Sequence, residues 1–125
     1  MQLGLGVIGL VDNLPKNRTC DVIGRQLLRC ATSVGANYRA SCRARSFEEV
    51  ISKLSIVEEE ADETMYWLEL LEQSKQAQQS DLRQLQQEAS EILAMTVASK
   101  KTLKARIGSP SFANPRPRRM GNRES

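Results

Sequence analysis

Four arginines recur along one stretch of the chain at a spacing that could contact phosphate groups: Arg25, Arg29, Arg39 and Arg43. At 100° per residue of an α-helix, the other three lie within about 40° of the first, so all four share one helix face. A guanidinium group donates paired hydrogen bonds to phosphate or carboxylate oxygens, and a row of them suits a polyanion. No aromatic residue interleaves the row, so we do not expect base stacking or sequence readout from it.

Two interpretations of this arginine row stay open. The row either contacts a polyanion, or it forms a solvated face that pairs with the acidic segment 58–63. Exposed ion pairs contribute only about 0–1 kcal/mol each, so pairing alone hardly requires such alignment.

The residue types of the chain argue against catalysis and metal binding. The chain has no histidine, which removes the commonest general base and transition-metal ligand. Cys20, Cys30 and Cys42 have spacings of neither a disulfide framework nor a zinc site, so we expect small core residues in a reducing compartment. Di-metal helical bundles use Glu-x-x-His motifs, so the acidic run predicts structural pairing. We therefore expect no enzyme, no metal and no cofactor.

Charge is strongly segregated along the chain. Residues 16–45 hold seven Lys or Arg and one acid, residues 46–99 hold twelve acids and three Lys or Arg, and residues 100–125 hold eight Lys or Arg and one acid. Such blocks favour either packing between oppositely charged helices or a basic surface for a polyanion. The last block includes a second basic cluster, made of Lys100, Lys101, Lys104 and Arg106.

Helical periodicity predicts the elements that position these charges. Residues 3–13 could form a short helix weakened by glycines, and Leu14-Pro15 predicts its end. The arginine row lies on a second helix around residues 21–45. Beside the apolar face of that helix, Asn37 is a candidate buried polar residue, with Glu63 or a hydroxyl of the third helix as its expected partner.

The third predicted helix begins with a capping box at Ser46 and Glu49 and runs to about residues 73–76. Besides its core face it has a second, partly apolar stripe, which predicts an interface with another subunit. The residues of this stripe are Ile56, Glu59, Glu63, Tyr66, Trp67 and Leu70. A fourth helix is predicted from Ser80-Asp81 to about Ile107-Gly108.

The fold class is therefore all-α: a helical bundle domain over residues 1–108, followed by a disordered basic tail over residues 109–125. No apolar run approaches the ~20 residues that span a bilayer. The apolar start lacks the cationic lead-in and cleavage site of a signal peptide, so we expect a cytoplasmic protein without membrane contact.

Several motifs together resemble the bacterial four helix bundle protein family, also called the 23S rRNA intervening-sequence protein family. The first part of the likeness consists of Leu14-Pro15, Gln26-Leu27-Leu28-Arg29 and the run from Ser33 to Ala40. The second part consists of Val57 to Glu63 and Trp67 to Leu71. The resemblance covers about residues 10–107, and Arg29, Asn37 and Glu63 match a recurrent arginine, asparagine and glutamate of the family.

This resemblance implies an up-and-down four-helix bundle that assembles as a homopentamer. A related branch, the accessory variability protein of diversity-generating retroelements, implies binding to a reverse transcriptase and to nucleic acid. The chain departs from the family in its first helix, which is several turns shorter: either the start codon is misplaced or the bundle lacks one full helix. It also reads Tyr38-Arg39-Ala40 where many members have an acidic residue and a glycine, which makes its surface more basic.

Two functions follow from these observations. The first is a non-catalytic oligomeric nucleic-acid or ribonucleoprotein accessory that binds RNA or DNA through Arg25, Arg29, Arg39, Arg43 and the basic cluster of residues 100–106. The second is a purely structural protein–protein interaction module whose arginine row pairs with the acidic third helix of a neighbouring subunit.

Overall fold

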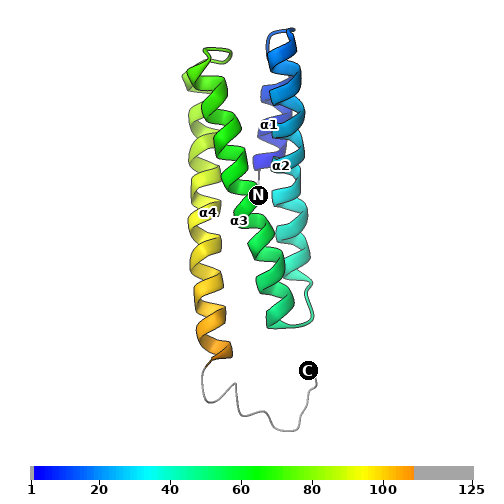
Figure 1. Cartoon of the computed structure of the whole chain (residues 1–125), viewed down its shortest axis with the longest axis vertical. Helices are drawn as coiled ribbons and strands as arrows, with labels where there is room; N and C mark the ends of the chain where they lie inside the picture. Colours follow the sequence, from blue (N-terminus) through cyan, green and yellow to red (C-terminus); the bar gives the residue numbers. More distant parts are fainter. Residues whose placement is uncertain (1, 109–125) are drawn as a thin grey trace.

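Over residues 2–108 the protein forms four antiparallel α-helices joined by short connections. A computed structural model describes residues 2–108, with the helices α1 (Leu3–Asp12), α2 (Arg18–Cys42), α3 (Phe47–Gln73) and α4 (Gln79–Ile107). The long helix α3 packs against both α2 and α4, and α1 packs against α2 and α4 (Figure 1). This confirms the all-α four-helix bundle for the part of the chain described, whereas the tail expected over residues 109–125 lies outside it.

Side chains outside the helices hold the starts of α2 and α3. The Asn17 side chain accepts a hydrogen bond from the backbone N–H of Cys20 at 2.8 Å, a cap that was not predicted from the sequence. The expected cap of α3 is present, because Ser46 Oγ accepts from the Glu49 N–H at 3.1 Å. The reciprocal bond differs from a standard capping box, since the Glu49 carboxylate accepts from the N–H of Arg45 at 2.8 Å.

The helix ends also follow local rules. At the end of α3 the Gln76 N–H donates to the Leu71 carbonyl and the Lys75 N–H donates to the Glu72 carbonyl, which together form a Schellman motif. Lys75 adopts the left-handed φ of 60° that this motif requires, although glycine is the usual residue there. Helix α2 ends earlier than predicted, so Arg43 is its C-cap residue and lies beyond the last helical position.

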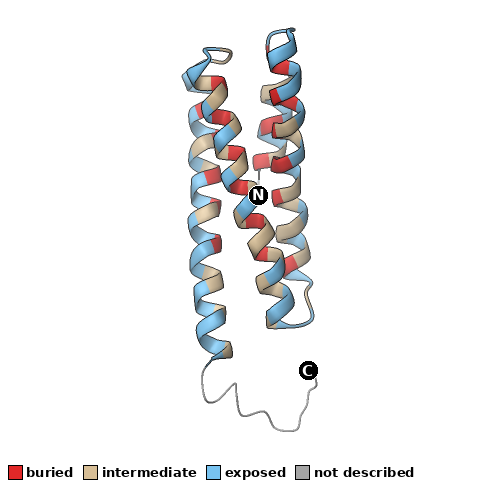
Figure 2. Ribbon diagram, viewed as in Figure 1, coloured by how far each residue is buried: buried red, intermediate tan, exposed pale blue. Residues whose placement is uncertain are grey.

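An aliphatic core runs along the bundle axis, as the low aromatic content led us to expect (Figure 2). Leu27 of α2, Leu68 of α3 and Leu82 of α4 have no exposed surface. Helix α1 contributes Leu3 and Val7, which are 1% and 0% exposed. The burial of these large side chains is the main favourable term in the stability of the bundle.

The first helix is short, as predicted, and it covers only part of the bundle. It has 10 residues, whereas α4 has 29. Gly6 allows its close approach to α4, because a Cβ there would lie 2.5 Å from Leu85 Cδ2. Gly24 of α2 has a similar role, because a Cβ there would lie 3.1 Å from Val11 Cγ1. Among the described residues, no helix continues in line with α1 along the other half of α2 and α4 (Figure 1).

Candidate functional site

Arg29 forms ion pairs with the acidic face of α3 in its own chain. Its Nη1 lies 3.2 Å from Glu60 Oε1 and its Nη2 donates to Glu63 Oε2. Its Nε donates to Gln26 Oε1 at 3.1 Å. Because α2 and α3 are antiparallel neighbours, the middle of the basic helix meets the middle of the acidic one. The carboxylates of Glu60 and Glu63 therefore already accept the hydrogen bonds that the Arg29 guanidinium would donate to a phosphate.

Trp67 completes this arrangement from the next turn of α3. Its Nε1 donates to Glu63 Oε2 at 3.0 Å, the same oxygen that Arg29 contacts. The rings of Tyr66 and Trp67 pack edge to face, with ring centroids 5.0 Å apart. Arg29, Glu60, Glu63 and Trp67 together form what we call the Arg29 network. This network joins the two helices at the surface above the core.

The Arg29 network stabilises the charged forms of both Arg29 and Glu63. The hydrogen bond from Trp67, followed by that from Arg29, lowers the pKa of the Glu63 carboxyl. The hydrogen bond to Glu63 raises the pKa of Arg29. Beneath the network, burial raises the pKa of the Cys30 thiol, which contacts Thr64 Oγ1 at 3.2 Å. Cys30 is therefore a protonated core residue rather than a nucleophile.

The lowered pKa of Glu63 predicts a dependence of stability on pH. Since the folded-state pKa is below the unfolded one, near 4.3, this contribution is full above that value and is lost as pH falls through the folded value. We expect Glu63→Gln to flatten the fall in the free energy of unfolding between about pH 5 and pH 3. Urea denaturation followed by circular dichroism measures this slope. The control is Glu59→Gln, one turn earlier on the exposed side of α3, and equal slopes for the two variants would contradict the prediction.

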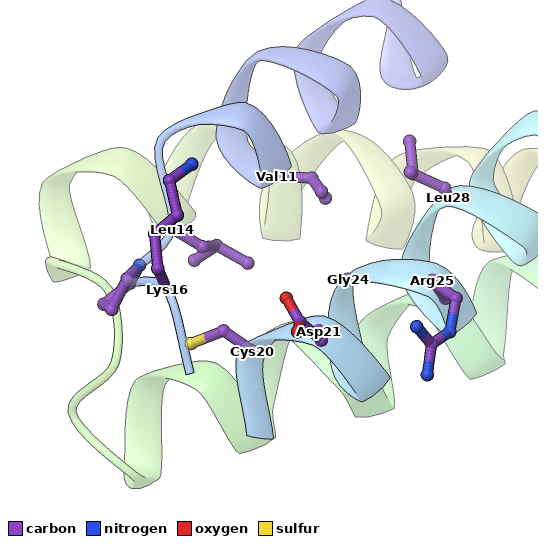
Figure 3. Close-up of a pocket in the computed structure, with 9 residues that line it drawn as sticks. Val11, Leu14, Lys16, Cys20, Asp21, Gly24, Arg25 and Leu28 are labelled. Carbon is purple, nitrogen blue, oxygen red and sulfur yellow. The ribbon is translucent and has the colours of Figure 1, made fainter. Parts of the chain in front are cut away.

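Arg25 lies in a different setting from Arg29. It is exposed and lines a cavity of about 200 Å³ between α1 and α2, together with Val11 and Leu28 (Figure 3). Lys16 and Asp21 are the other charged residues that line this cavity. At 1.5 Å per residue, Arg25 is about 21 Å from Arg39 along the helix axis. The two belong to opposite halves of the molecule.

Arg39 and Arg43 lie near the end of the bundle where α4 also ends (Figure 1). The basic cluster at the end of α4 therefore lies at the same end of the bundle, although nearly sixty residues separate the two segments. Arg45, in the connection that follows α2, lies at the same end. We call this set the basic end, made of Arg39, Arg43, Arg45, Lys101, Lys104 and Arg106.

The predicted nucleic-acid-binding residues thus do not form one surface: some belong to the basic end, some form ion pairs within the chain, and one lies towards the opposite end. Arg29 is engaged in its own network, and Arg25 lies towards the opposite end. Lys100 is also engaged, because its Nζ lies 2.8 Å from Glu58 Oε1 and its side chain is only 17% exposed. Arg45 was not among the residues predicted from the sequence. The predicted second helix included Arg45, and only the earlier end of α2 in the structure places it in the connection.

The expected partner of Asn37 was wrong. Asn37 is half-buried, and its Nδ2 donates to the carbonyl and hydroxyl oxygens of Ser33 at 2.9 and 3.0 Å. These contacts lie within α2, one turn back, so neither Glu63 nor a hydroxyl of α3 is its partner. Ser33 in turn donates to Glu60 Oε2 at 3.3 Å. Asn37 therefore reaches α3 only through Ser33.

The second stripe of α3 is only partly available to another subunit. Tyr66 is 52% exposed, and Glu59 is also exposed. Ile56 and Leu70 are half-buried, and Leu70 packs against the core. Glu63 and Trp67 belong to the Arg29 network. The oligomer interface stays a prediction.

Residues 2–108 contain neither a candidate metal site nor a candidate membrane-spanning helix. In that range, no three His, Cys, Asp or Glu side chains gather into a group that could hold a metal ion. None of the four helices combines the length and apolar character that crossing a bilayer requires.

These observations define the chain as an all-α four-helix bundle protein with oppositely charged neighbouring helices. A family model for the 23S rRNA-intervening sequence protein matches residues 1–98, and the chain belongs to this family. It is similar to a crystal structure from Bacteroides thetaiotaomicron VPI-5482, of a protein with unknown function from the S23 ribosomal protein family. That likeness has 31% sequence identity and a TM-score of 0.73, and covers 80% of this chain and 93% of the other. No curated protein matches the chain.

Proposed function

We propose that the protein is a non-catalytic, homo-oligomeric accessory that binds RNA or DNA in the cytoplasm through its basic end. The observation that supports this is that the basic end of α2, the α2–α3 connection and the basic end of α4 all lie at one end of the bundle (Figure 1). The family name, which refers to an insertion in ribosomal RNA, makes RNA the first ligand to test.

Helix stability alone does not account for all of these charges. Lys104 and Arg106 suit the negative end of the α4 dipole, which a cation in the last turn stabilises. Arg39 has the same role at the end of α2. Arg43 and Arg45 lie beyond the last helical position, and Lys101 precedes the last turn of α4. Arg39 and Arg43 form no ion pair within residues 2–108, so their guanidinium groups are available to phosphate.

The first test measures binding of a fluorescein-labelled single-stranded RNA of twenty nucleotides by anisotropy, at several salt concentrations. We expect the triple variant Arg43→Glu, Lys101→Glu, Lys104→Glu to bind at least about tenfold more weakly. The slope of log K against log salt should also fall in magnitude by about 2, because each phosphate contact to a single strand contributes about 0.7. Light scattering on the same samples gives the mass of the assembly.

A matched control carries the same change of charge at the opposite end of the bundle. Lys16→Glu, Arg18→Glu, Lys75→Glu reverses three basic residues next to the α1–α2 and α3–α4 connections. We expect it to lose much less affinity. Equal losses in the two triple variants, or binding by the unaltered protein that does not change with salt, would refute the proposal.

The alternative function, a structural module, has partial support from the Arg29 network. That network pairs a basic helix with an acidic one, but within one chain. Pairing of the other arginines with a neighbouring subunit stays a prediction. If the arginines pair with a neighbouring subunit, the triple variant at Arg43, Lys101 and Lys104 should change the mass of the oligomer and leave its RNA affinity unchanged.

A further inference from the structure

The cavity of about 200 Å³ between α1 and α2 lies where α1 ends and the chain turns into α2 (Figure 3). Val11 and Leu14 line it from the end of α1 and from the connection, and Leu28 lines it from α2. Gly24 also lines it, and a Cβ there would lie 3.1 Å from Val11 Cγ1. A side chain at this position would therefore enter the space that the apolar side chains enclose.

Three charged side chains line the same cavity: Lys16 from the connection, and Asp21 and Arg25 from α2. All three are exposed, and none of them forms an ion pair within residues 2–108. Asp21 and Arg25 are four residues apart on α2, a spacing at which an acid and a base can pair across one helical turn. Because they do not pair with each other, both charges are available to an occupant of the cavity.

The volume of the cavity sets the size of its occupant. An apolar cavity of about 150 Å³ binds benzene, so a cavity of about 200 Å³ holds a molecule that is only slightly larger. L-leucine is of this size, and its charged groups would lie at the rim, where the charged side chains are. A fatty acid with a long chain exceeds this volume.

The signs of the charges define the head group of the occupant. An apolar amine would pair with Asp21 and meet two cations, whereas an apolar carboxylate would pair with the cations and meet Asp21. An α-amino acid has an ammonium group and a carboxylate on the same carbon atom, so each of the three side chains meets an opposite charge. Side chains four residues apart on a helix have Cβ atoms about 5–6 Å apart, a separation that such a zwitterion can bridge.

We propose that the cavity between α1 and α2 binds a free α-amino acid with an apolar side chain of the size of leucine. The apolar side chain packs on Val11 and Leu28. The ammonium group pairs with Asp21, and the carboxylate pairs with Lys16 and Arg25. This inference does not depend on nucleic-acid binding.

The test is a titration of the unaltered, ¹⁵N-labelled chain with L-leucine, followed by NMR. We expect a Kd of about 0.1–1 mM, because so small a ligand gains limited binding free energy. The amide signal of Gly24, which lines the cavity, should shift, whereas that of Gly35, further along α2, should not.

Two analogues separate the charges of the ligand. Isoamylamine has the apolar chain and the ammonium group of leucine without its carboxylate, and isocaproate has the carboxylate without the ammonium group. We expect each of them to bind at least about fivefold more weakly than leucine, because each loses one charged pair and leaves a like charge opposite it.

Variants separate the charges of the protein. Asp21→Asn keeps the shape of the side chain and removes its charge, so it should weaken leucine binding at least about fivefold and should not weaken isocaproate binding. Lys16→Gln should weaken both. The matched control is Asp62→Asn, which removes an exposed carboxylate of α3 that does not line the cavity, and it should change neither affinity. Asp21 and Lys16 are exposed, so their variants leave the core unaltered.

The proposal fails if the Gly24 signal does not shift at about 20 mM leucine, a concentration well above the expected Kd. It also fails if either analogue binds as tightly as leucine, since the site would then recognise a single charge. Equal leucine affinity in Asp21→Asn and Asp62→Asn would remove Asp21 from the site and overturn the proposed pairing.

Discussion

The variant Leu68→Ala is expected to lose about 2–5 kcal/mol of unfolding free energy. Leu68 is on α3, the helix that packs against both α2 and α4, and it has no exposed surface. Truncation removes buried methyl groups and leaves a cavity that these long helices can close only in part. Urea denaturation followed by circular dichroism at 222 nm measures the loss, which is a large share of the stability of a domain of this size.

The matched control for this variant is Leu5→Ala. Leu5 lies on α1 and is 70% exposed, so its truncation removes little buried surface. We expect a change within about 0.5 kcal/mol. A large loss at Leu5 would mean that its exposed side chain is covered in solution. A small loss at Leu68 would contradict the core described for α3.

The second large effect is expected at Gly6, where α1 meets α4. A Cβ there would lie 2.5 Å from Leu85 Cδ2, and a leucine would have to displace that buried side chain or move α1 away. Overpacking of this kind costs about 1–3 kcal/mol. We therefore expect Gly6→Leu to lower the urea midpoint, although leucine favours a helix more than glycine does.

Gly9→Leu is the control for Gly6. It lies on the same helix, and a Cβ there meets nothing within 4 Å. The helix propensity of leucine should then dominate and leave the stability unchanged or higher by up to about 1 kcal/mol. If both variants lost stability equally, the close approach of α1 to α4 would not be the reason why Gly6 is glycine.

Most of the local structure could be predicted from the sequence. Apolar side chains at helical spacing located all four helices, and Ser46 with Glu49 located the start of α3, because these signals act within one or two turns. The end of α2 was placed too late. No glycine or proline lies between Cys42 and Ser46, so the sequence has no strong stop signal there.

The site was predicted less well, because it depends on how the helices are placed against each other. Periodicity places Arg29 and Arg39 on one face of α2, but it does not state which of them lies opposite Glu60 and Glu63. The register of α2 against α3 decides that, and it engages Arg29 alone of this pair. The same holds for Asn37, whose side chain turns back to Ser33 instead of crossing to α3. That Arg43 and Lys104 lie at one end of the bundle follows from the antiparallel order of the helices.

The placement of α1 has a consequence for the order of folding. Contacts of α1 with α2, of α2 with α3 and of α3 with α4 join helices that are neighbours in sequence, across connections of a few residues, so these pairs form with little loss of chain entropy. The contact between α1 and α4 is different, because it brings together segments about eighty residues apart. This pairing carries the largest closure entropy in the bundle, so we expect the contact between α1 and α4 to form last and to open first.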